Sequence, residues 1–181
     1  MEQKLLGLEA ASWWTRGKAV IVDFLIFIAV LCIPAALIIT STIFAHDEYS
    51  DEFDFSGRSS IFLISGILSG VGALIWSGWL FGYRQGVTGT TPGKRRMGIS
   101  LVDEESGNNP GGARGVGRWL VPVLVGSIPT FGNIVQVIDF LWPLWDPKKQ
   151  RLIDKILKTR VIVQTTTELR NRPPDPSNPI S

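Results

Sequence analysis

The stretch from Phe24 to Ala45 reads FLIFIAVLCIPAALIITSTIFA and has no charged residue in 22 positions. A helix of this length crosses a hydrocarbon core of about 30 Å. A second uncharged stretch, residues 59–83, has 25 positions and is also long enough. The sequence therefore predicts an all-α integral membrane protein with two long transmembrane helices, over about residues 19–45 and 59–85.

A third apolar stretch, residues 119–145, is less regular than the first two. Pro122, Pro129 and the pair Gly132-Asn133 interrupt it, and Asp139 lies near its end. Proline and glycine break or kink a helix, which disfavours one straight span. Two structures are compatible with this broken third segment: a re-entrant hairpin or a kinked third span.

The distribution of charge orients the spans. Residues 1–18 contain three basic and two acidic residues, whereas residues 45–58 contain one basic and five acidic. Residues 84–118 contain six basic and three acidic. Because segments rich in Lys and Arg stay in the cytoplasm, the N-terminal segment 1–18 and residues 84–118 are predicted to be cytoplasmic. Residues 146–181, with eight basic and four acidic, favour the same side and hence the re-entrant hairpin.

Three further segments lie outside the spans. Residues 96–102 (RMGISLV) and 159–164 (TRVIVQ) are short β-branched runs that are predicted to pair as a small cytoplasmic β unit. The run 146–161 has apolar residues at helical spacing among lysines and arginines, which predicts a basic interfacial helix. Its apolar positions are Leu152, Ile153, Ile156 and Leu157. The proline-rich tail, residues 165–181, is predicted to be disordered.

Asp23 is a carboxylate near the start of the first span. It follows Arg16 by seven residues, so the two share one face of a helix. A carboxylate inside a span costs roughly 3 kcal/mol, so it should face a partner or water rather than lipid. Two interpretations follow: Asp23 binds a proton or a monovalent cation, or it pairs with Lys18 or a loop arginine and fixes helix packing.

Asp139 is the second candidate for ion binding. It lies in the irregular third stretch, where the ends of half-helices could create an ion site. The alternative is an interfacial aspartate whose charge is offset by Lys148 or Lys149.

A ridge of small residues runs along the second span. Gly66, Gly70, Gly78 and Gly82 are spaced by multiples of four, and Gly86 continues the series. Such a ridge lets two helix backbones approach closely. It predicts either a homo-oligomer interface or intramolecular packing against the first span.

Two groups of basic residues flank the apolar stretches. Lys94, Arg95 and Arg96 follow the second span, and Lys148, Lys149 and Arg151 follow the third stretch. Clusters of this kind bind the headgroups of anionic lipids, although the first group is also explained as a topology signal alone. We therefore expect the lipid bilayer and anionic headgroups as partners, and no nucleic acid.

Several classes of protein are excluded by composition. Cys32 and His46 are the single cysteine and the single histidine, so a Cys/His zinc site, an internal disulfide and a histidine-based triad cannot form. No nucleophile is placed with a base. We expect no metal site, no cofactor and no enzymatic activity.

Three segments together resemble the RDD family of membrane proteins: Arg16 with Asp23, TPGKRRMGISLV from Thr91, and DPKKQRLIDKILKTRVIV from Asp146. The resemblance covers residues 11–164 as one membrane domain. It implies that Arg16 and Asp23 are the arginine and first aspartate for which the family is named.

By the same resemblance Asp154 is the second aspartate, and it could reach Arg16 as a clasp. Many members have His-Asp where this chain has Ile153-Asp154, so no role of that histidine is carried over. Some members look like monovalent cation/proton antiporters.

Two functions are compatible with these features. One is cation/proton exchange, with Asp23 alternately holding a proton and a cation, which would require a homo-oligomer to wall a pathway. The other is a non-enzymatic scaffold that binds anionic lipid or partner membrane proteins. In both, the chain is a multi-pass protein of the plasma membrane with a cytoplasmic N-terminus.

Overall fold

Two long apolar helices dominate the structure, a computed structural model that describes residues 9–46 and 53–164. The first, α1, is Trp13–Ala45. The second runs from Gly57 to Thr88 as α2 (Gly57–Ser77), the π-helix η2 (Gly78–Arg84) and α3 (Gln85–Thr88). Both are long and apolar enough to cross a membrane, which confirms the two long apolar helices that the sequence predicts. The predicted tail, residues 165–181, lies outside the described residues.

Helix α1 begins earlier than predicted. It starts at Trp13, inside the segment 1–18 that the charge pattern assigned to the N-terminal region. The hydroxyl of Ser12 accepts the backbone N–H of Thr15 at 3.2 Å, as an N-terminal capping residue does. Capping therefore sets the start of the helix, and the apolar boundary near residue 19 does not.

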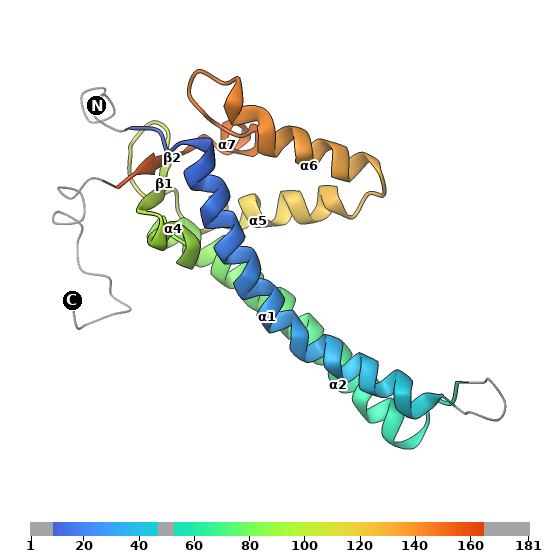
Figure 1. Ribbon diagram of the computed structural model, residues 1–181. Helices are drawn as coiled ribbons and strands as arrows, with labels where there is room; N and C mark the ends of the chain where they lie inside the picture. The colour runs from blue at the N-terminus through green and yellow to red at the C-terminus, as the bar shows by residue number, and fades with distance from the viewer. Residues whose placement is uncertain (1–8, 47–52, 165–181) are drawn as a thin grey trace, which may run out of the picture. The chain divides into compact units, whose positions relative to one another are not determined.

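The described chain forms two compact units, and the first consists of residues 24–77. Within it α1 and α2 form a helical hairpin (Figure 1). The hydroxyl of Ser41 donates to the carbonyl of Ser59 at 2.6 Å, and Gly66 lies against Pro34 and Ile38 of α1. Only 6% of the most apolar stretch of α1, and 17% of that of the second helix, is buried. Long apolar helices with so little burial are typical of a bilayer environment.

The second unit contains residues 9–23 and 78–164. Its strands β1 (Ile99–Asp103) and β2 (Thr159–Val163) pair antiparallel, with Leu101 opposite Val161, which confirms the predicted pairing. Residues 9–11 extend this sheet, because the N–H of Ala11 donates to Val161 at 3.1 Å. A small core joins the sheet to the start of α1. Its buried residues are Ala11, Ala19, Ile99, Leu101 and Val161.

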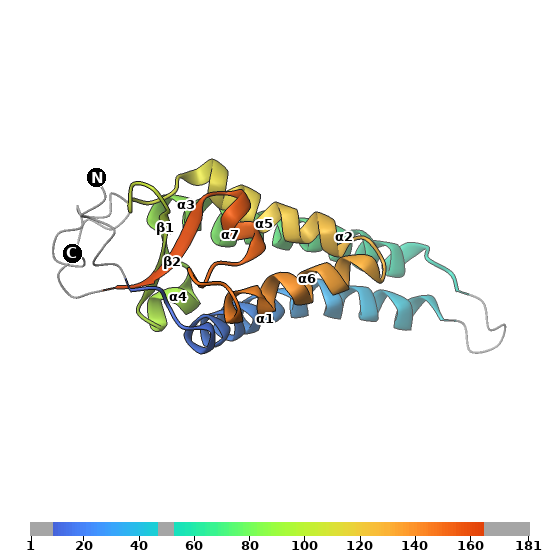
Figure 2. The ribbon, with the colours of Figure 1, turned by 90° about the horizontal axis from the view of Figure 1, so that it is seen from above.

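The third apolar stretch is broken into a helical hairpin. Helix α5 (Gly112–Gly126) and helix α6 (Phe131–Leu141) lie side by side, and the 3₁₀ turn η3 (Trp142–Leu144) follows (Figure 2). The side chain of Gln136 on α6 donates to the carbonyl of Pro122 on α5 at 2.8 Å. A Cβ atom at Gly132 would collide with the carbonyl of Val125, so this close approach requires glycine. Entry of the hairpin into the bilayer stays a prediction.

The predicted basic interfacial helix over 146–161 is largely wrong. Helix α7 is Leu152–Ile156, five residues long. Residues 146–150 form turns before it, and Lys149 and Lys158 both have positive φ angles, of 53° and 50°. Lys158 therefore ends the helix and directs the chain into β2. Because Ile153 is 4% exposed and Ile156 is 72% exposed, the spacing of apolar residues did not define one buried face.

The glycine ridge packs inside the chain, against two different partners. Gly66 and Gly70 lie against α1, as one of the two interpretations predicted. Gly78 and Gly82 lie against Trp119 of α5 instead, and Gly86 lies against Gly115. That interpretation expects the first span as the partner of the whole ridge; the other, a homo-oligomer interface, stays a prediction. The partner changes because η2 packs along α5, a helix that the broken third stretch provides.

Packing at Gly66 can be tested by substitution. A Cβ atom there would lie 2.7 Å from Cγ1 of Ile38 and 3.2 Å from its backbone nitrogen, whereas a Cβ at Gly72 meets nothing within 4 Å. We expect Gly66→Leu to lower the free energy of unfolding by about 1–3 kcal/mol through overpacking. The matched control Gly72→Leu should leave thermal unfolding in detergent unchanged. Equal destabilisation by both variants would contradict this packing.

Candidate functional site

The centre of the second unit is the buried carboxylate of Asp154, whose side chain has no solvent exposure. Arg118 of α5 forms an ion pair and a hydrogen bond with one of its oxygens. Arg16 of α1 lies 3.6 Å from the other oxygen, so the contact that the sequence suggested between these two residues is present. The backbone N–H of Arg151 also donates to the Asp154 carboxylate at 3.1 Å. This hydrogen bond caps the N-terminal end of α7.

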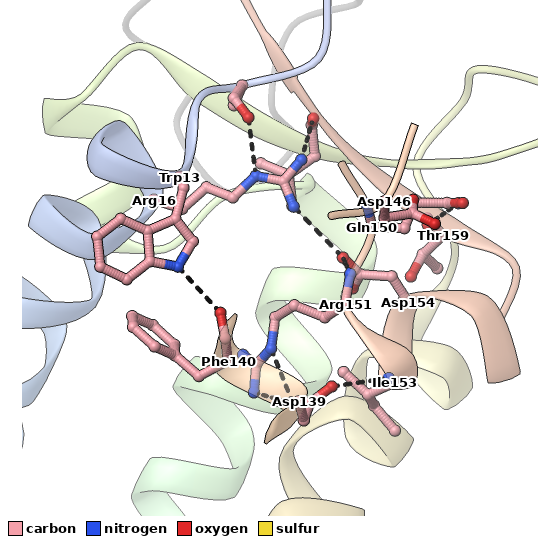
Figure 3. A network of polar contacts seen from close by, with 12 residues as sticks. Trp13, Arg16, Asp139, Phe140, Asp146, Gln150, Arg151, Ile153, Asp154 and Thr159 are labelled. Atoms are coloured by element: carbon pink, nitrogen blue, oxygen red, sulfur yellow. Dashed lines mark hydrogen bonds and ion pairs between the residues drawn. The ribbon is translucent and has the colours of Figure 1, made fainter. Parts of the chain in front are cut away.

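Arg16 joins three parts of this unit (Figure 3). Its Nε donates to the carbonyl of Ala11 at 3.1 Å, and its Nη2 donates to the carbonyl of Val161 at 3.0 Å. Its Nη1 faces Asp154 and has no hydrogen-bond partner among the described residues. Arg16 thereby ties the start of α1 to the sheet and to α7.

Arg118 extends the network to β2. It donates to the hydroxyl of Thr159 at 2.7 Å, and the carbonyl of Thr159 accepts the side-chain N–H of Gln150 at 3.0 Å. Thr159 and Gln150 are both buried. Polar groups that are removed from water must be paired within the protein, and these residues satisfy one another.

The charge state of Asp154 follows from its neighbours. Burial alone would raise the pKa of this carboxyl, but the charge and hydrogen bond of Arg118, together with the charge of Arg16, hold the pKa below its ordinary value. Asp154 is therefore ionised at neutral pH, where it is shared between two arginines.

Asp139 is also paired with an arginine. Arg151 donates to Oδ2 of Asp139 through its Nε at 2.9 Å and also through Nη2, while the backbone N–H of Ile153 donates to Oδ1 at 3.0 Å. The sequence suggested Lys148 or Lys149 as the compensating charge, and that was wrong. Lys148 instead contacts Glu104 at 2.6 Å. The turn before α7 points Arg151, rather than the two lysines, towards α6.

Asp23 is held by neutral donors. The hydroxyl of Thr91 donates to its Oδ2 at 2.6 Å, and the backbone N–H of Gly93 donates to its Oδ1 at 2.7 Å. Both donors lie at the start of α4 (Pro92–Arg96), so Asp23 fixes this helix against α1. A Cβ atom at Gly93 would collide with the carbonyl of Ala19. Among the described residues Asp23 forms no ion pair with Lys18 or with a loop arginine, contrary to that interpretation.

A cavity of about 50 Å³ lies beside the network of Asp154. Its charged lining residues are all cationic: Arg16, Lys94, Arg118 and Arg151. The remaining lining residues are apolar or aromatic: Trp13, Val20, Phe140, Pro143 and Val161. Figure 3 shows Trp13, Arg16, Phe140 and Arg151 around this space. The indole N–H of Trp13 donates to the carbonyl of Phe140 at 3.0 Å and closes one side of it.

Lys94 is partly enclosed, unlike its exposed neighbours Arg95 and Arg96. The side-chain amide of Gln85 is oriented so that its nitrogen donates to the carbonyl of Phe81. Its oxygen then accepts a hydrogen bond from the Lys94 ammonium. Burial and the charge of Arg118 lower the pKa of Lys94 to about 7, although Asp23 opposes the shift. Of the six residues assigned to lipid headgroups from sequence, Lys94 and Arg151 therefore line the cavity. The other four are on the surface: Arg95, Arg96, Lys148 and Lys149.

The sequence identified Arg16, Asp23, Asp139 and Asp154 but missed their main partners. In the sequence Arg118 is only one of the basic residues before the third stretch. Thr159 belongs to a predicted strand, and nothing in the sequence indicates a role for Gln150. No spacing along the chain relates Arg118 to Asp154, which lie 36 residues apart. The fold of the α5–α6 hairpin creates that contact.

Comparison with known proteins identifies the family. The model of the RDD family matches residues 10–158. The chain belongs to the RDD family. It is therefore an RDD membrane protein, and its two long apolar helices agree with that assignment.

Curated relatives occur in mycobacteria. A proline-rich antigen homolog of Mycobacterium tuberculosis (strain CDC 1551 / Oshkosh) is 31% identical over 152 residues, which cover 81% of this chain and 60% of the relative. The proline-rich antigen of Mycobacterium leprae (strain TN) is 36% identical over 101 residues, which cover 50% of this chain and 38% of the relative. This RDD protein thus spans about three fifths or less of the relatives' length. No solved structure matches it significantly.

The buried network makes a prediction for stability. Asp154→Asn leaves Arg118 and Arg16 without their shared carboxylate, which should destabilise the fold by about 3–5 kcal/mol. The control is Glu105→Gln, because Glu105 pairs with Lys158 at an exposed site. Thermal unfolding in detergent, followed by circular dichroism, measures both variants. A similarly small change of the unfolding temperature in both variants would contradict a central role of Asp154.

The same network makes a prediction for pH. Because the folded-state pKa of Asp154 lies below its unfolded value, its stabilising contribution is complete above the unfolded value of about 3.9 and is lost at lower pH. The unfolding temperature of the wild type should therefore fall as the pH drops below about 5, and Asp154→Asn should show a smaller fall. An equal pH dependence of the unfolding temperature in the two proteins would show that Asp154 is not the source of this loss of stability.

Proposed function

We propose that this RDD protein is a non-enzymatic membrane scaffold that binds anionic lipid headgroups through the unit formed by residues 9–23 and 78–164. One observation carries the proposal. In the described part of this unit there are fourteen basic and eight acidic side chains, a net charge of +6. Six of the eight acidic side chains are already in ion pairs with basic ones.

The surplus positive charge is available for outside partners. Arg95, Arg96 and Lys149 are exposed and form no ion pair with the described residues. Basic side chains next to an anionic membrane surface contribute about 1 kcal/mol each to its attraction. The charge pattern supports placing this unit on the cytoplasmic side of the plasma membrane, because residues 45–58, between the two apolar stretches, include five acidic residues and one basic.

The α5–α6 hairpin supports a position at the membrane. Its outer side chains are large, apolar and exposed, among them Leu124, Phe131, Ile134 and Val137. An apolar surface of this extent is unfavourable in water and is typical of a membrane or protein contact. In the proposal the hairpin enters the bilayer from the side that carries the basic unit.

Cation/proton exchange is the second candidate, and Asp23 on a spanning helix is the observation that favours it. Both oxygens of Asp23 accept hydrogen bonds from Thr91 and Gly93, and Asp139 is paired with Arg151. A cation at either carboxylate would have to displace these donors. The contacts therefore support a structural role for both residues.

Lipid preference can be measured in vesicles of phosphatidylcholine with a minor fraction of phosphatidylglycerol. Quenching of the seven tryptophans by brominated phosphatidylglycerol, relative to brominated phosphatidylcholine, reports which lipid surrounds the protein. We expect a preference for phosphatidylglycerol that weakens at least about thirtyfold in Arg95→Glu/Arg96→Glu, because each arginine contributes about 1 kcal/mol and about 1.4 kcal/mol is tenfold. The control is Arg58→Glu, at the start of α2. No preference in the wild type, even at low salt, would refute the proposal.

Transport can be measured in everted vesicles as proton flux driven by sodium, lithium or potassium. The scaffold proposal predicts no flux above empty vesicles, and it predicts that Asp23→Asn lowers thermal stability by about 1–2 kcal/mol by weakening buried hydrogen bonds. Cation-driven flux that disappears in Asp23→Asn, with stability unchanged, would instead establish the exchanger and assign Asp23 as its ion site.

A further inference from the structure

The cavity beside Asp154 holds more positive than negative charge. Arg16, Lys94, Arg118 and Arg151 line it. Three carboxylates lie near these residues: Asp154, shared by Arg16 and Arg118; Asp139, paired with Arg151; and Asp23, close enough to affect Lys94. With Lys94 protonated, four cations face three anions, which leaves an excess of one positive charge in a partly enclosed, largely apolar space. Such an excess is unfavourable without an added anion.

Arg16 provides a second, independent observation that favours an anion in this cavity. The residue is only 7% exposed, yet its Nη1 has no hydrogen-bond partner among the described residues and lies 3.6 Å from the nearest carboxylate oxygen. A buried donor that is left unpaired costs about 1–3 kcal/mol. Arg16 also lines the cavity, so an anion bound there would lie beside a guanidinium whose hydrogen bonds are incomplete.

We propose that this cavity binds one phosphate group, held by Arg16, Lys94, Arg118 and Arg151, and that the phosphate belongs to the headgroup of a membrane lipid. This inference rests on the proposed lipid-binding function and assigns it a single internal site. Guanidinium groups match the geometry of phosphate oxygens and form strong, charge-assisted hydrogen bonds with them. The single excess positive charge matches the single negative charge of a phosphodiester.

The size and walls of the cavity fit this ligand. Its volume of about 50 Å³ holds roughly three to five water-sized atoms, comparable with the four oxygens of a phosphate. The aromatic rings of Trp13 and Phe140 meet edge to face, 5.3 Å apart, and form an apolar wall. Tryptophan is typical of the headgroup level of a membrane. At that level the glycerol backbone of a lipid would contact this aromatic wall while its phosphate contacts the cations.

Lys94 couples this site to pH. Burial lowers its pKa to about 7, and the charges of Arg118, Asp23, Asp154 and Arg151 also act on it. A bound phosphate favours the protonated ammonium and so raises its pKa. By linkage, phosphate binds more tightly below the pKa of the empty site and more weakly as the pH rises through it.

The test uses the full chain purified in dodecyl maltoside, a detergent without phosphate, with bound molecules counted by native mass spectrometry. The probes are phosphatidylglycerol, diacylglycerol with the same acyl chains, and inorganic phosphate. The wild type should retain one tightly bound phosphatidylglycerol and no diacylglycerol. Lys94→Met should weaken this binding at least about tenfold, while the control Arg58→Met, at an exposed site outside this unit, should change it less than about twofold.

The pH dependence gives a second measurement on the unchanged protein, in case Lys94→Met folds poorly. Affinity of the wild type for phosphatidylglycerol should fall several-fold between about pH 6 and pH 8.5. Binding of the lipid but not of inorganic phosphate identifies a headgroup site. Binding of inorganic phosphate with the same dependence on Lys94 identifies a soluble phosphate as the source.

Three outcomes would overturn the inference: equal binding of diacylglycerol, equal losses in Lys94→Met and Arg58→Met, or many weak lipid sites without a tight one. In each of them a preference for phosphatidylglycerol in vesicles would still support the proposed function. Loss of that preference as well would refute both the internal phosphate site and the proposed lipid-binding function.

Discussion

The buried carboxylate of Asp154, shared between Arg118 and Arg16, is the interaction on which the second unit of this RDD protein depends. Asp154 lies on α7, Arg118 on α5 and Arg16 on α1, so one carboxylate joins three helices. Through the same arginines it reaches Thr159 of β2 and the carbonyl of Val161. A buried charge is tolerated only when it is paired, and that requirement fixes the positions of all these elements together.

The same constraint explains how charge is divided in this unit. Three of its aspartates are paired within the unit. Asp154 and Asp139 form ion pairs with arginines, and Asp23 accepts hydrogen bonds from the start of α4. The basic residues outnumber them, so the surplus appears as exposed arginines and lysines and as a cavity whose charged lining is cationic. Arg16, Asp23 and Asp154, the residues that the sequence singles out, thus hold the structure in place, and the surplus charge is positive.

Much of the fold was predictable from the sequence because the decisive signals are local. Uncharged stretches define the two long helices, and β-branched runs define the strand pair. The prolines and glycines of residues 119–145 correctly indicated a break. The failures are non-local: the spacing around Ile153 and Ile156 suggested a long helix, whereas Lys158 ends it and turns the chain into β2. Arg118 was missed because its contact with Asp154 exists only after α5 and α7 meet.

A double-mutant cycle between Arg118 and Asp154 tests the central claim most directly. The unfolding free energies of Arg118→Met, Asp154→Asn and the double variant give the coupling energy of the pair. The account predicts a large favourable coupling, of about 3 kcal/mol, with the double variant more stable than the sum of the single losses implies. A coupling near zero would contradict the account, because the two side chains would then not depend on each other.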